Sequence, residues 1–492
     1  MADPRGFLKT KRQSAKYRPV CVRVKDYKDV VLPRSDEASK EQASRCMDCG
    51  TAFCHFACPI GNYIPEWNDL VYRNQWKRAF QLLDATNNLP EITGRLCPAL
   101  CEYGCVLGIN DDPVTIRENE LAIIEYGFDA GFIRANPPKK RTGKKIAVIG
   151  SGPSGLAVAA QLNKAGHDVT VFERDDKIGG ILRFGIPDFK LEKWLIDRRI
   201  NLYEKEGIEF ITNTNAGVDI KAAKLKKDFD AIVLTAGSRV ARDLKIEGRD
   251  LNGIYFAMDY LIQSNKRVAG AKRSDSASPE LVEGPKKTQW IDAKGKKVVV
   301  IGGGDTGADC VGTANRQGAA CVVQIEVMPK PSECRTEDFP WPKYPLLIKT
   351  STSHEEGADR SWSILTKKFI GENGKLKELV CVRVEFEKDA KGCPLMKEVK
   401  NSEFEIEADI ALLAVGFVSP EHSPLLTDLG VDYDQRGNVQ TDSHFMTKAK
   451  GVFSAGDMHR GQSLIVHAIA EGRQAAYSVD SYLMGKSTLP AI

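Results

Sequence analysis

The stretch KKIAVIGSGPSGLAVAAQLNKAGHDVTVFERDDKIGG, residues 144–180, decides the fold of this 492-residue chain. Its apolar, β-branched run at 146–149 is typical of a strand buried on both faces of a parallel sheet. Three glycines follow at G-x-G-x-x-G spacing, and residues 156–164 then have the pattern of an amphipathic helix. We therefore predict a strand, a tight turn and a helix. The glycines are Gly150, Gly152 and Gly155.

Each glycine of this motif has its own physical role. One permits the turn, one lets the backbone approach a pyrophosphate, and one lets the helix pack against the strand, with the phosphates at the helix N-terminus. A second apolar strand, residues 168–172, ends at Glu173, where a carboxylate can bind both hydroxyls of an adenosine ribose. A lone glycine motif could be a structural turn, but this complete unit predicts a dinucleotide site.

The same pattern recurs later in the chain. An apolar strand at 298–301 leads into GGGDTG, a helix follows to Gln317, and the next strand ends in Glu326. Two complete units predict two bound dinucleotides. Its motif glycines are Gly302, Gly304 and Gly307.

The donor nucleotide is less clear from these residues. Glu326 would bind the ribose hydroxyls of NADH and repel the 2′-phosphate of NADPH. However, Lys330, Arg335 and Lys343 follow in a Pro-rich loop and could bind that phosphate. Both nucleotides stay open, with a slight preference for NADH.

Composition narrows the class of protein. Apolar residues make up 42% and charged residues 28%, as in ordinary globular proteins, and the net charge of +4 gives no reason to expect nucleic acid or an anionic membrane as a partner. The sequence contains no apolar run of membrane-spanning length, and its N-terminus lacks the apolar region of a signal peptide. We expect a cytoplasmic protein.

Seven of the thirteen cysteines are crowded between residues 46 and 105. The first four form a close run that ends in Cys-Pro, as in iron–sulfur proteins, and only one C-x2-C pair is present where structural zinc commonly uses two. Iron–sulfur ligation is favoured over zinc and over purely structural cysteines. The seven are Cys46, Cys49, Cys54, Cys58, Cys97, Cys101 and Cys105, and the remaining six are interpreted as buried small hydrophobes.

Seven cysteines cannot fill the eight ligand positions of two 4Fe-4S clusters. Either one iron takes another ligand or one cluster is incomplete. Glu118 and Glu120 lie near the start of a predicted helix, where each is most simply a solvated acid that favours the helix dipole.

The order of the motifs predicts an α/β chain with two Rossmann-like nucleotide-binding domains of the disulfide-reductase type, preceded by a mainly helical iron–sulfur domain. No C-x4-C pair follows the first nucleotide unit, so electrons should leave through the cysteine-rich domain instead. A late Gly-Asp pair places Asp457 where it can cap a helix or lie beside a flavin's ribityl hydroxyls. The predicted boundaries are 1–140 for the iron–sulfur domain, 141–265 with 416–492 for FAD, and 266–415 for NAD(P)H with a mobile insertion at 265–295.

These motifs together resemble the small (beta) subunit of glutamate synthase over nearly the whole chain. The cysteine pattern, GSGPSGL, GGILRFGIPDFKL, LTAGS, GGGDTG and VFSAGD carry the resemblance. The module is also similar to the N-terminal half of dihydropyrimidine dehydrogenase and to the large subunit of electron-bifurcating NADH-dependent ferredoxin:NADP oxidoreductase.

The resemblance implies specific ligand sets. Relatives place a carboxylate or glutamine six residues beyond the first residue of a V-T-I-like triplet, which here is Glu120. One 4Fe-4S cluster would be held by Cys46, Cys49, Cys54 and Cys105, and the other by Cys58, Cys97, Cys101 and Glu120. FAD would lie on Gly150, Gly152, Gly155, Glu173, Gly180 and Asp457, and NAD(P)H on Gly302, Gly304, Gly307 and the 326–335 loop with Glu326 and Arg335.

The resemblance also implies a reaction. NAD(P)H would reduce FAD, and electrons would pass through the clusters to a large subunit that makes glutamate from glutamine and 2-oxoglutarate. Hydride transfer needs no general acid or base from this chain, so no catalytic side chain is assigned. The alternatives are a bifurcating or ferredoxin-linked NAD(P) oxidoreductase subunit, and a non-catalytic flavin-binding scaffold whose flavin NADH would not bleach.

Overall fold

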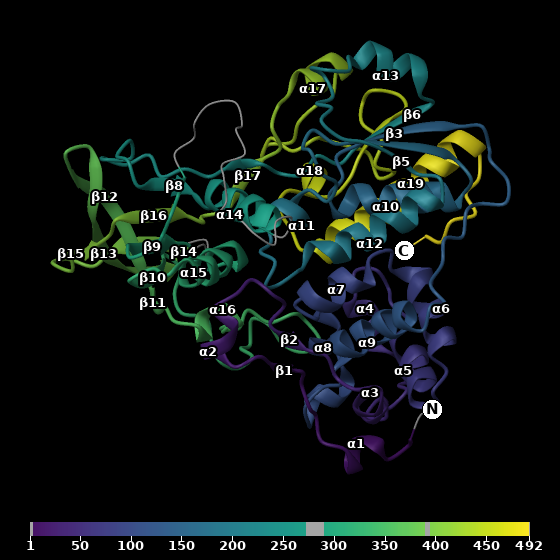
Figure 1. Ribbon diagram of the computed structural model, residues 1–492, viewed down its shortest axis with the longest axis horizontal. Coiled ribbons are helices and arrows are strands. Elements are labelled where there is room, and N and C mark those ends of the chain that lie inside the picture. The colour runs from purple at the N-terminus through teal and green to yellow at the C-terminus, as the bar shows by residue number, and fades with distance from the viewer. Residues whose placement is uncertain (1–2, 272–289, 389–393, 492) are drawn as a thin grey trace.

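The computed structural model describes residues 3–271, 290–388 and 394–491. Figure 1 shows three parts: a helical N-terminal part, a parallel sheet above it that is flanked by α10 and α19, and a second sheet to one side. The predicted fold class, two nucleotide-binding α/β units preceded by a mainly helical domain, is confirmed.

The N-terminal part packs around its own apolar core, which includes Trp67, Leu83 and Ile123. Residues 64–86 form two helices, and Asn74, with a positive φ of 59°, lies between them. The stacked rings of Trp76 and Tyr126 join the second of these helices to the last one. The elements are α1 (Gly6–Lys9), β1 (Lys16–Tyr17), α2 (Val20–Arg23), β2 (Val31–Leu32), α3 (Asp36–Ala43), α4 (Phe53–Ala57), α5 (Ile64–Tyr72), α6 (Trp76–Thr86), α7 (Pro90–Leu96), α8 (Leu100–Tyr103), the 3-10 helix η1 (Val106–Ile109) and α9 (Ile116–Asp129).

The first nucleotide-binding sheet is parallel, with strand order β18-β6-β3-β4-β5. Buried β-branched residues fill its strands, and α10 packs against the long C-terminal α19 on one face. The strands are β3 (Lys145–Ile149), β4 (Asp168–Phe172), β5 (Glu209–Ile211), β6 (Ala231–Leu234) and β18 (Val452–Ser454). The helices are α10 (Pro153–Lys164), α11 (Ile181–Phe184), α12 (Lys193–Lys205), α13 (Ala222–Asp228), α17 (Pro424–Leu429), α18 (Asp457–Arg460) and α19 (Ile465–Met484).

The second sheet is also parallel, with order β11-β10-β9-β16-β8. Its strands are β8 (Ile254–Phe256), β9 (Lys297–Ile301), β10 (Cys321–Glu326), β11 (Asp359–Trp362) and β16 (Ile410–Leu413), and its helices are α14 (Ala257–Ala271), α15 (Asp305–Gln317) and α16 (Thr352–Glu355). Since β8 belongs to this sheet, the sheet begins before the boundary predicted at residue 266.

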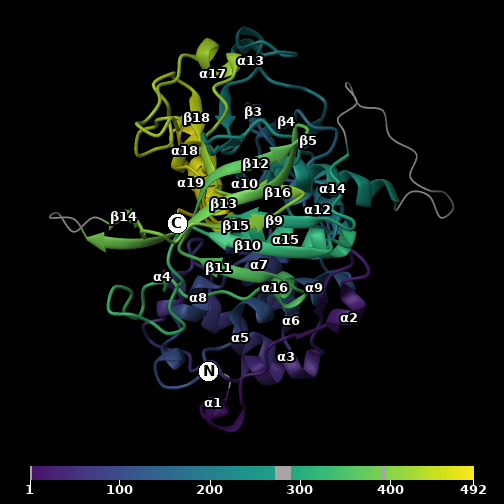
Figure 2. The ribbon, with the colours of Figure 1, turned by 90° about the vertical axis from the view of Figure 1, so that its left-hand side faces the viewer.

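Two smaller sheets complete the fold. An antiparallel sheet continues from the second unit, and its β14 projects to one side of the molecule (Figure 2). It contains β12 (Ile364–Glu372), β13 (Lys375–Lys388), β14 (Pro394–Glu398) and β15 (Phe404–Glu407). The pair β7 (Val240–Ala241) and β17 (Phe417–Ser419) is antiparallel and lies where the chain passes between the two nucleotide-binding units.

The predicted insertion at 265–295 is only partly described. Residues 265–271 are the end of α14, and the Asn265 side chain is buried and donates to the carbonyl of Phe184. Ile291 and Ala293 are also buried. Asn265, Ile291 and Ala293 are therefore packed into the structure, while residues 272–289 lie outside the described residues.

None of the helices in the described ranges combines the length and apolarity needed to cross a lipid bilayer.

Candidate functional site

The first glycine motif forms the turn that the sequence predicts. Gly150 has φ of 103°, and a side chain there would press against the carbonyl of Thr235. A Cβ at Gly155 would lie 2.0 Å from the carbonyl oxygen of Gly150, so this position requires close contact between helix and strand. A Cβ at Gly152 would meet nothing within 4 Å, and Gly152 is the N-cap of α10. This open position at a helix N-terminus suits a pyrophosphate.

Glu173 lies at the end of β4 and faces this turn. Its Oε2 accepts hydrogen bonds from the backbone N–H of Ser151 at 3.1 Å and from Ser151 Oγ at 2.5 Å, while Oε1 accepts from the Asp175 N–H. Gly180, with φ of 51°, packs close to Gly152. The acid is therefore held at the rim of the glycine turn, where an adenosine ribose would lie.

Asp457 is the first residue of α18 and follows Gly456. Ser463 Oγ donates to Asp457 Oδ1 at 2.7 Å. Burial raises the pKa of Asp457 to about 6, so the carboxylate is ionised at neutral pH and can accept further hydrogen bonds from hydroxyl groups.

The second glycine motif repeats the first almost contact for contact. Gly302 has φ of 124° and abuts the carbonyl of Ala414, Gly304 is the open N-cap of α15, and a Cβ at Gly307 would lie 2.3 Å from the carbonyl oxygen of Gly302. Glu326 accepts from the Gly303 N–H at 2.6 Å and from the Met328 N–H at 3.0 Å. Glu326 thus accepts hydrogen bonds from the glycine turn and from the residue two positions later, as Glu173 does in the first unit.

The guanidinium of Arg335, predicted as a possible partner of the NADPH 2′-phosphate, is bound to other groups. Its guanidinium donates to three carbonyl oxygens, those of Phe339, Lys343 and Tyr103. The last of these belongs to the helical domain, and the ring of Trp341 packs on Phe53 of that domain. The loop around Arg335 therefore contacts the iron–sulfur domain, and the structure does not bring Arg335 together with Glu326.

The seven crowded cysteines surround two separate cavities of the helical domain. Cys46, Cys49, Cys54 and Cys105 line one cavity, and Cys58, Cys97, Cys101 and Glu120 line another. These are the two ligand sets that the resemblance implies. In the described ranges no three His, Cys, Asp or Glu side chains are close enough to hold a single metal ion, so each set surrounds a space rather than a point.

Two short helices connect the two cavities. In α4 the carbonyl of Cys54, a first-set residue, accepts from the N–H of Cys58, a second-set residue. Cys101 and Cys105, which straddle the end of α8, are likewise divided between the sets. Four residues of helix advance about 6 Å, so cysteines that belong to different cavities follow one another along the backbone by about one helical turn.

Glu120 is a buried acid rather than the solvated acid that its sequence position favours. Burial raises its pKa to about 8. Both of its hydrogen bonds, from Thr93 Oγ1 and from Asn87 Nδ2, go to Oε1, and among the described residues Oε2 has no hydrogen bond. Glu118, by contrast, accepts from the Ala15 N–H and pairs with Arg34, away from both cavities. Glu120 thus lines the second cavity with one carboxylate oxygen that has no hydrogen bond among the described residues.

The other cysteines only partly match their prediction. Cys310 and Cys381 are buried, but Cys21, Cys321 and Cys334 are exposed, so the interpretation as buried hydrophobes is wrong for these three. Cys393 lies outside the described residues. In the ligand sets, burial raises the pKa of Cys46 and Cys58 to about 12 and that of Cys97 to about 11. Such thiols ionise readily only when a metal takes their proton's place.

Comparison with known proteins shows which family the chain belongs to. Residues 23–131 match the family described as dihydropyrimidine dehydrogenase domain II, 4Fe-4S cluster, and residues 144–472 match the pyridine nucleotide-disulphide oxidoreductase family. The chain is 54% identical over 492 residues to the glutamate synthase [NADPH] small chain of Mycobacterium tuberculosis, with 100% of this chain and 98% of the relative covered. The chain belongs to the glutamate synthase small-chain family.

Two further relatives show the range of this family. The small chain of glutamate synthase [NADPH] from Bacillus subtilis is 48% identical, with both chains fully covered. Glutamate synthase [NADH] of Saccharomyces cerevisiae is 45% identical over 99% of this chain, which spans 23% of the yeast protein. Among solved structures, FprA from M. tuberculosis superposes with a TM-score of 0.55 at 17% identity, over 70% of this chain and 85% of FprA, which supports the fold alone.

Several residues of the small chain's sites were not singled out in the sequence. Ser151 and Gly303, the middle residues of the two turns, bind the acids at the strand ends. Thr93 and Asn87 orient Glu120. Ser151 lies inside the motif and could have been found there, but Thr93 and Asn87 are distant in sequence and carry no motif.

Proposed function

We propose that this chain is the NAD(P)H-oxidising small chain of a glutamate synthase. It would bind FAD in the first unit, NAD(P)H in the second and two 4Fe-4S clusters in the helical domain, and deliver electrons to a large chain that makes glutamate from glutamine and 2-oxoglutarate. The relatives named as small chains support the partner, and the two matched families support the cofactor classes.

One observation carries the proposal: the two cavities are arranged in series from the flavin-type unit. Val466 of α19, which belongs to that unit, lines the second cavity together with its three cysteines. Cys58 and Cys97 also pack against the core that contains α10 and α19, although Cys58 touches the core of the helical domain as well and Cys101 lies within it. Cys46 and Cys105 lie in the core of the helical domain. The second set is therefore nearer the flavin site, and the first set continues away from it.

The chain's own residues bind and orient the cofactors rather than exchange protons. FAD, when bound, accepts a hydride and releases electrons singly, which connects a two-electron donor to one-electron carriers. Gly152 and Gly304 leave room for the two pyrophosphates, and Glu173 and Glu326 face the two riboses. Asp457 would accept hydrogen bonds from the ribityl chain. The seven cysteines and Glu120 would hold the iron.

We also place the protein in the cytoplasm. All twelve cysteines in the described ranges are free, as expected in a reducing compartment. Iron–sulfur ligation likewise requires cysteines that are not oxidised to disulfides.

Anaerobic purification of the chain with and without the co-expressed large chain tests the proposal. We expect a yellow protein with iron and sulfide in equal amounts, a flavin that NAD(P)H bleaches, and glutamate formation only when both chains are present. Zinc in place of iron, absence of flavin, or a flavin that neither NADH nor NADPH reduces would contradict it.

A further inference from the structure

The N-terminal segment 18–30, which we call the arm, joins all three parts of the molecule. It leaves the helical domain and crosses to the second nucleotide-binding unit, so that α2 lies beside α16 (Figure 1). Asp29 pairs with Arg95 of the helical domain at 3.2 Å, and the Val30 N–H donates to the carbonyl of Phe189 in the flavin-type unit. The end of the arm at Asp29 and Val30 is therefore held by the helical domain and the flavin-type unit, while the part around α2 contacts the second nucleotide-binding unit.

Arg23 is the arm's main contact with the nucleotide unit. Its side chain is 2% exposed, and it donates to Glu356 Oε1 at 2.7 Å, to Glu355 Oε2 at 2.8 Å and to the carbonyl of Thr352 at 2.8 Å. All three partners belong to α16 or follow it directly. A buried guanidinium with this many partners holds α16 in one position.

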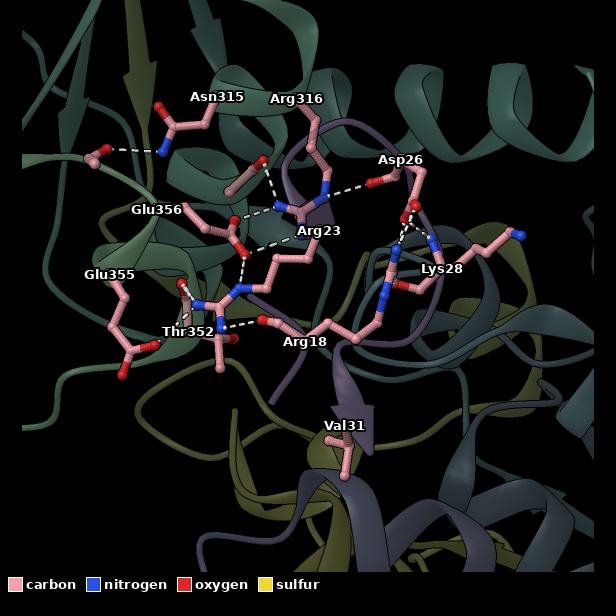
Figure 3. Close-up of polar contacts among 12 residues, drawn as sticks. Arg18, Arg23, Asp26, Lys28, Val31, Asn315, Arg316, Thr352, Glu355 and Glu356 are labelled. Carbon is pink, nitrogen blue, oxygen red and sulfur yellow. Dashed lines mark hydrogen bonds and ion pairs between the residues drawn. The ribbon is translucent and has the colours of Figure 1, made fainter. Parts of the chain in front are cut away.

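Glu356 lies between two guanidinium groups (Figure 3). Its fully buried carboxylate binds Arg23 and also Arg316 of α15. Arg316 in turn donates to the carbonyl of Asp26 in the arm at 2.9 Å and lies over the ring of Phe189, 3.7 Å from its centroid. Arm, α15 and α16 therefore share one buried ionic cluster.

From α16 the contacts continue to the glycine turn of the nucleotide site. His354 Nδ1 accepts from the Ser351 N–H, so its Nε2 carries the proton and donates to Gln324 Oε1 at 2.9 Å. Burial lowers the pKa of His354 to about 4, which keeps the ring neutral. Gln324 Nε2 then donates to the carbonyl of Gly302 at 2.8 Å. One helix of four residues thus separates Arg23 from the turn that would hold the pyrophosphate.

We propose that Arg23 is a positioning residue for NAD(P)H: through α16, His354 and Gln324, the arm of the iron–sulfur domain sets the geometry of the glycine turn at 302–307. The proposal rests on the proposed function only in taking the second unit as the NAD(P)H site. It makes the iron–sulfur domain part of the apparatus that binds the electron donor, in addition to its part in carrying electrons away.

Anaerobic stopped-flow reduction of the flavin, at varied NADH and separately NADPH, tests this in the full chain. We expect Arg23→Ala to raise the Kd for the nucleotide about three- to tenfold, the size of effect seen for residues that couple sites through packed contacts. Flavin content and cluster reduction by dithionite should not change. Arg23→Lys, which keeps the charge but loses the forked donor geometry, should recover part of the affinity.

Arg141→Ala is the matched control. Arg141 ties the linker to the flavin-type unit through Asn163 and the carbonyls of His167 and Glu206, and it does not contact the nucleotide unit. If Arg23 contributes only to stability, Arg23→Ala and Arg141→Ala should both lower the thermal unfolding midpoint, and the Kd for the nucleotide should stay at its wild-type value in both. That result would overturn the proposal.

His354→Ala provides a second test that leaves the ionic cluster intact. We expect the same rise in the Kd for the nucleotide in His354→Ala. This variant tests the proposal even if Arg23→Ala does not fold. An unchanged Kd in a folded His354→Ala variant would overturn the proposal. Failure of the proposed function is distinguishable: the wild-type flavin would not bleach, while calorimetric titration with the nucleotide would still measure the effect of each variant on binding.

Discussion

Glu120 shows how a single residue acquires a role from its surroundings. Its position near the start of α9 is typical of an exposed acid, yet it is 6% exposed and both its hydrogen bonds go to one carboxylate oxygen. A buried charge needs compensation by partners or by a metal. A cluster bound in the second cavity, which has only three cysteines, would offer that compensation.

Replacing Glu120 should therefore remove one iron site. In Glu120→Ala we expect iron and sulfide per flavin to fall from about eight to about four, because a 4Fe-4S cluster needs four protein ligands. Glu118→Ala, whose side chain contacts Ala15 and Arg34 instead, should keep the full content. Equal iron in the Glu120 variant and the wild type, measured by elemental analysis, would show that the eighth ligand is another group.

Glu326 should make NADH the better donor. Its carboxylate is fixed by two backbone N–H groups, as that of Glu173 is. Of the nearby cations, Arg335 is bound to carbonyls and Lys330 is paired with Glu333 at 3.6 Å. A 2′-phosphate would meet a fixed negative charge there.

We expect a higher kcat/KM for NADH than for NADPH in ferricyanide reduction. Glu326→Ala should shift that ratio toward NADPH by about tenfold, which corresponds to about 1.4 kcal/mol. Glu333→Gln, a neutralised acid in the same loop, is the control and should leave the ratio unchanged. A wild-type preference for NADPH would refute this assignment of Glu326.

Asp457 should make stability depend on pH when no flavin is bound. Its pKa rises from 3.8 to about 6 on folding, so the folded state binds the proton more tightly than the unfolded state. The contribution of Asp457 to stability is therefore fully present below about pH 4 and is lost as pH rises from about 4 to 6, by at most about 3 kcal/mol. Asp457→Asn should lack this component. Urea denaturation of flavin-free protein at pH 4 and pH 7 measures how much the free energy of unfolding changes between the two pH values. An equal change in Asp457→Asn and in the wild type would count against this prediction.

The two glycine turns show what an element requires of its sequence. In each, the first glycine needs a positive φ, and the last must lack a Cβ because the carbonyl of the first lies in the way. These requirements are local, which is why strand, turn, helix and terminal acid could all be predicted from residues 144–180.

Gly307→Ala should therefore abolish nucleotide binding and spare the flavin. The new methyl group would lie 2.3 Å from the carbonyl oxygen of Gly302, so helix α15 must shift away from the turn. Flavin absorbance should persist while NAD(P)H no longer bleaches it. The exposed Gly270 of α14, whose Cβ would meet no atom within 4 Å, offers a neutral Gly270→Ala control. Bleaching at the wild-type rate in Gly307→Ala would contradict the assigned geometry.

Elements that depend on distant contacts could not be predicted in the same way. The break between α5 and α6 depends on Asn74 in the left-handed region, a position that no pattern marks. Residues 265–271 fall within the segment predicted as an insertion, but they end α14, where the buried Asn265 donates a hydrogen bond to the carbonyl of Phe184. The arm carries no motif at all, because its partners Glu355 and Glu356 lie more than 300 residues away.

In the whole molecule, the flavin-type unit, the second cavity and the first cavity follow one another in space. The cysteine sets could be predicted from the family resemblance, but the order could not, because it depends on how α19 packs against the helical domain. Val466 of α19 makes that contact, because it lines the second cavity beside the three cysteines.

This order predicts where a block in electron flow would appear. Cys49→Ser, in the first set, should leave flavin bleaching by NAD(P)H and reduction of the second cluster intact while stopping glutamate formation with the large chain. Rapid-freeze paramagnetic spectroscopy would show the remaining cluster reduced. Glutamate formation at the wild-type rate in Cys49→Ser would mean that the first set does not lie between the second set and the large chain.

The helices α4 and α8 bear on how the protein matures. Each has a cysteine for one iron site at one end and a cysteine for the other site one turn later. If a cluster forms in each cavity, insertion of one would fix the ends of both helices and so position ligands of the other. We therefore expect the two clusters to assemble cooperatively, and oxidative loss of one to loosen the ligands of the other.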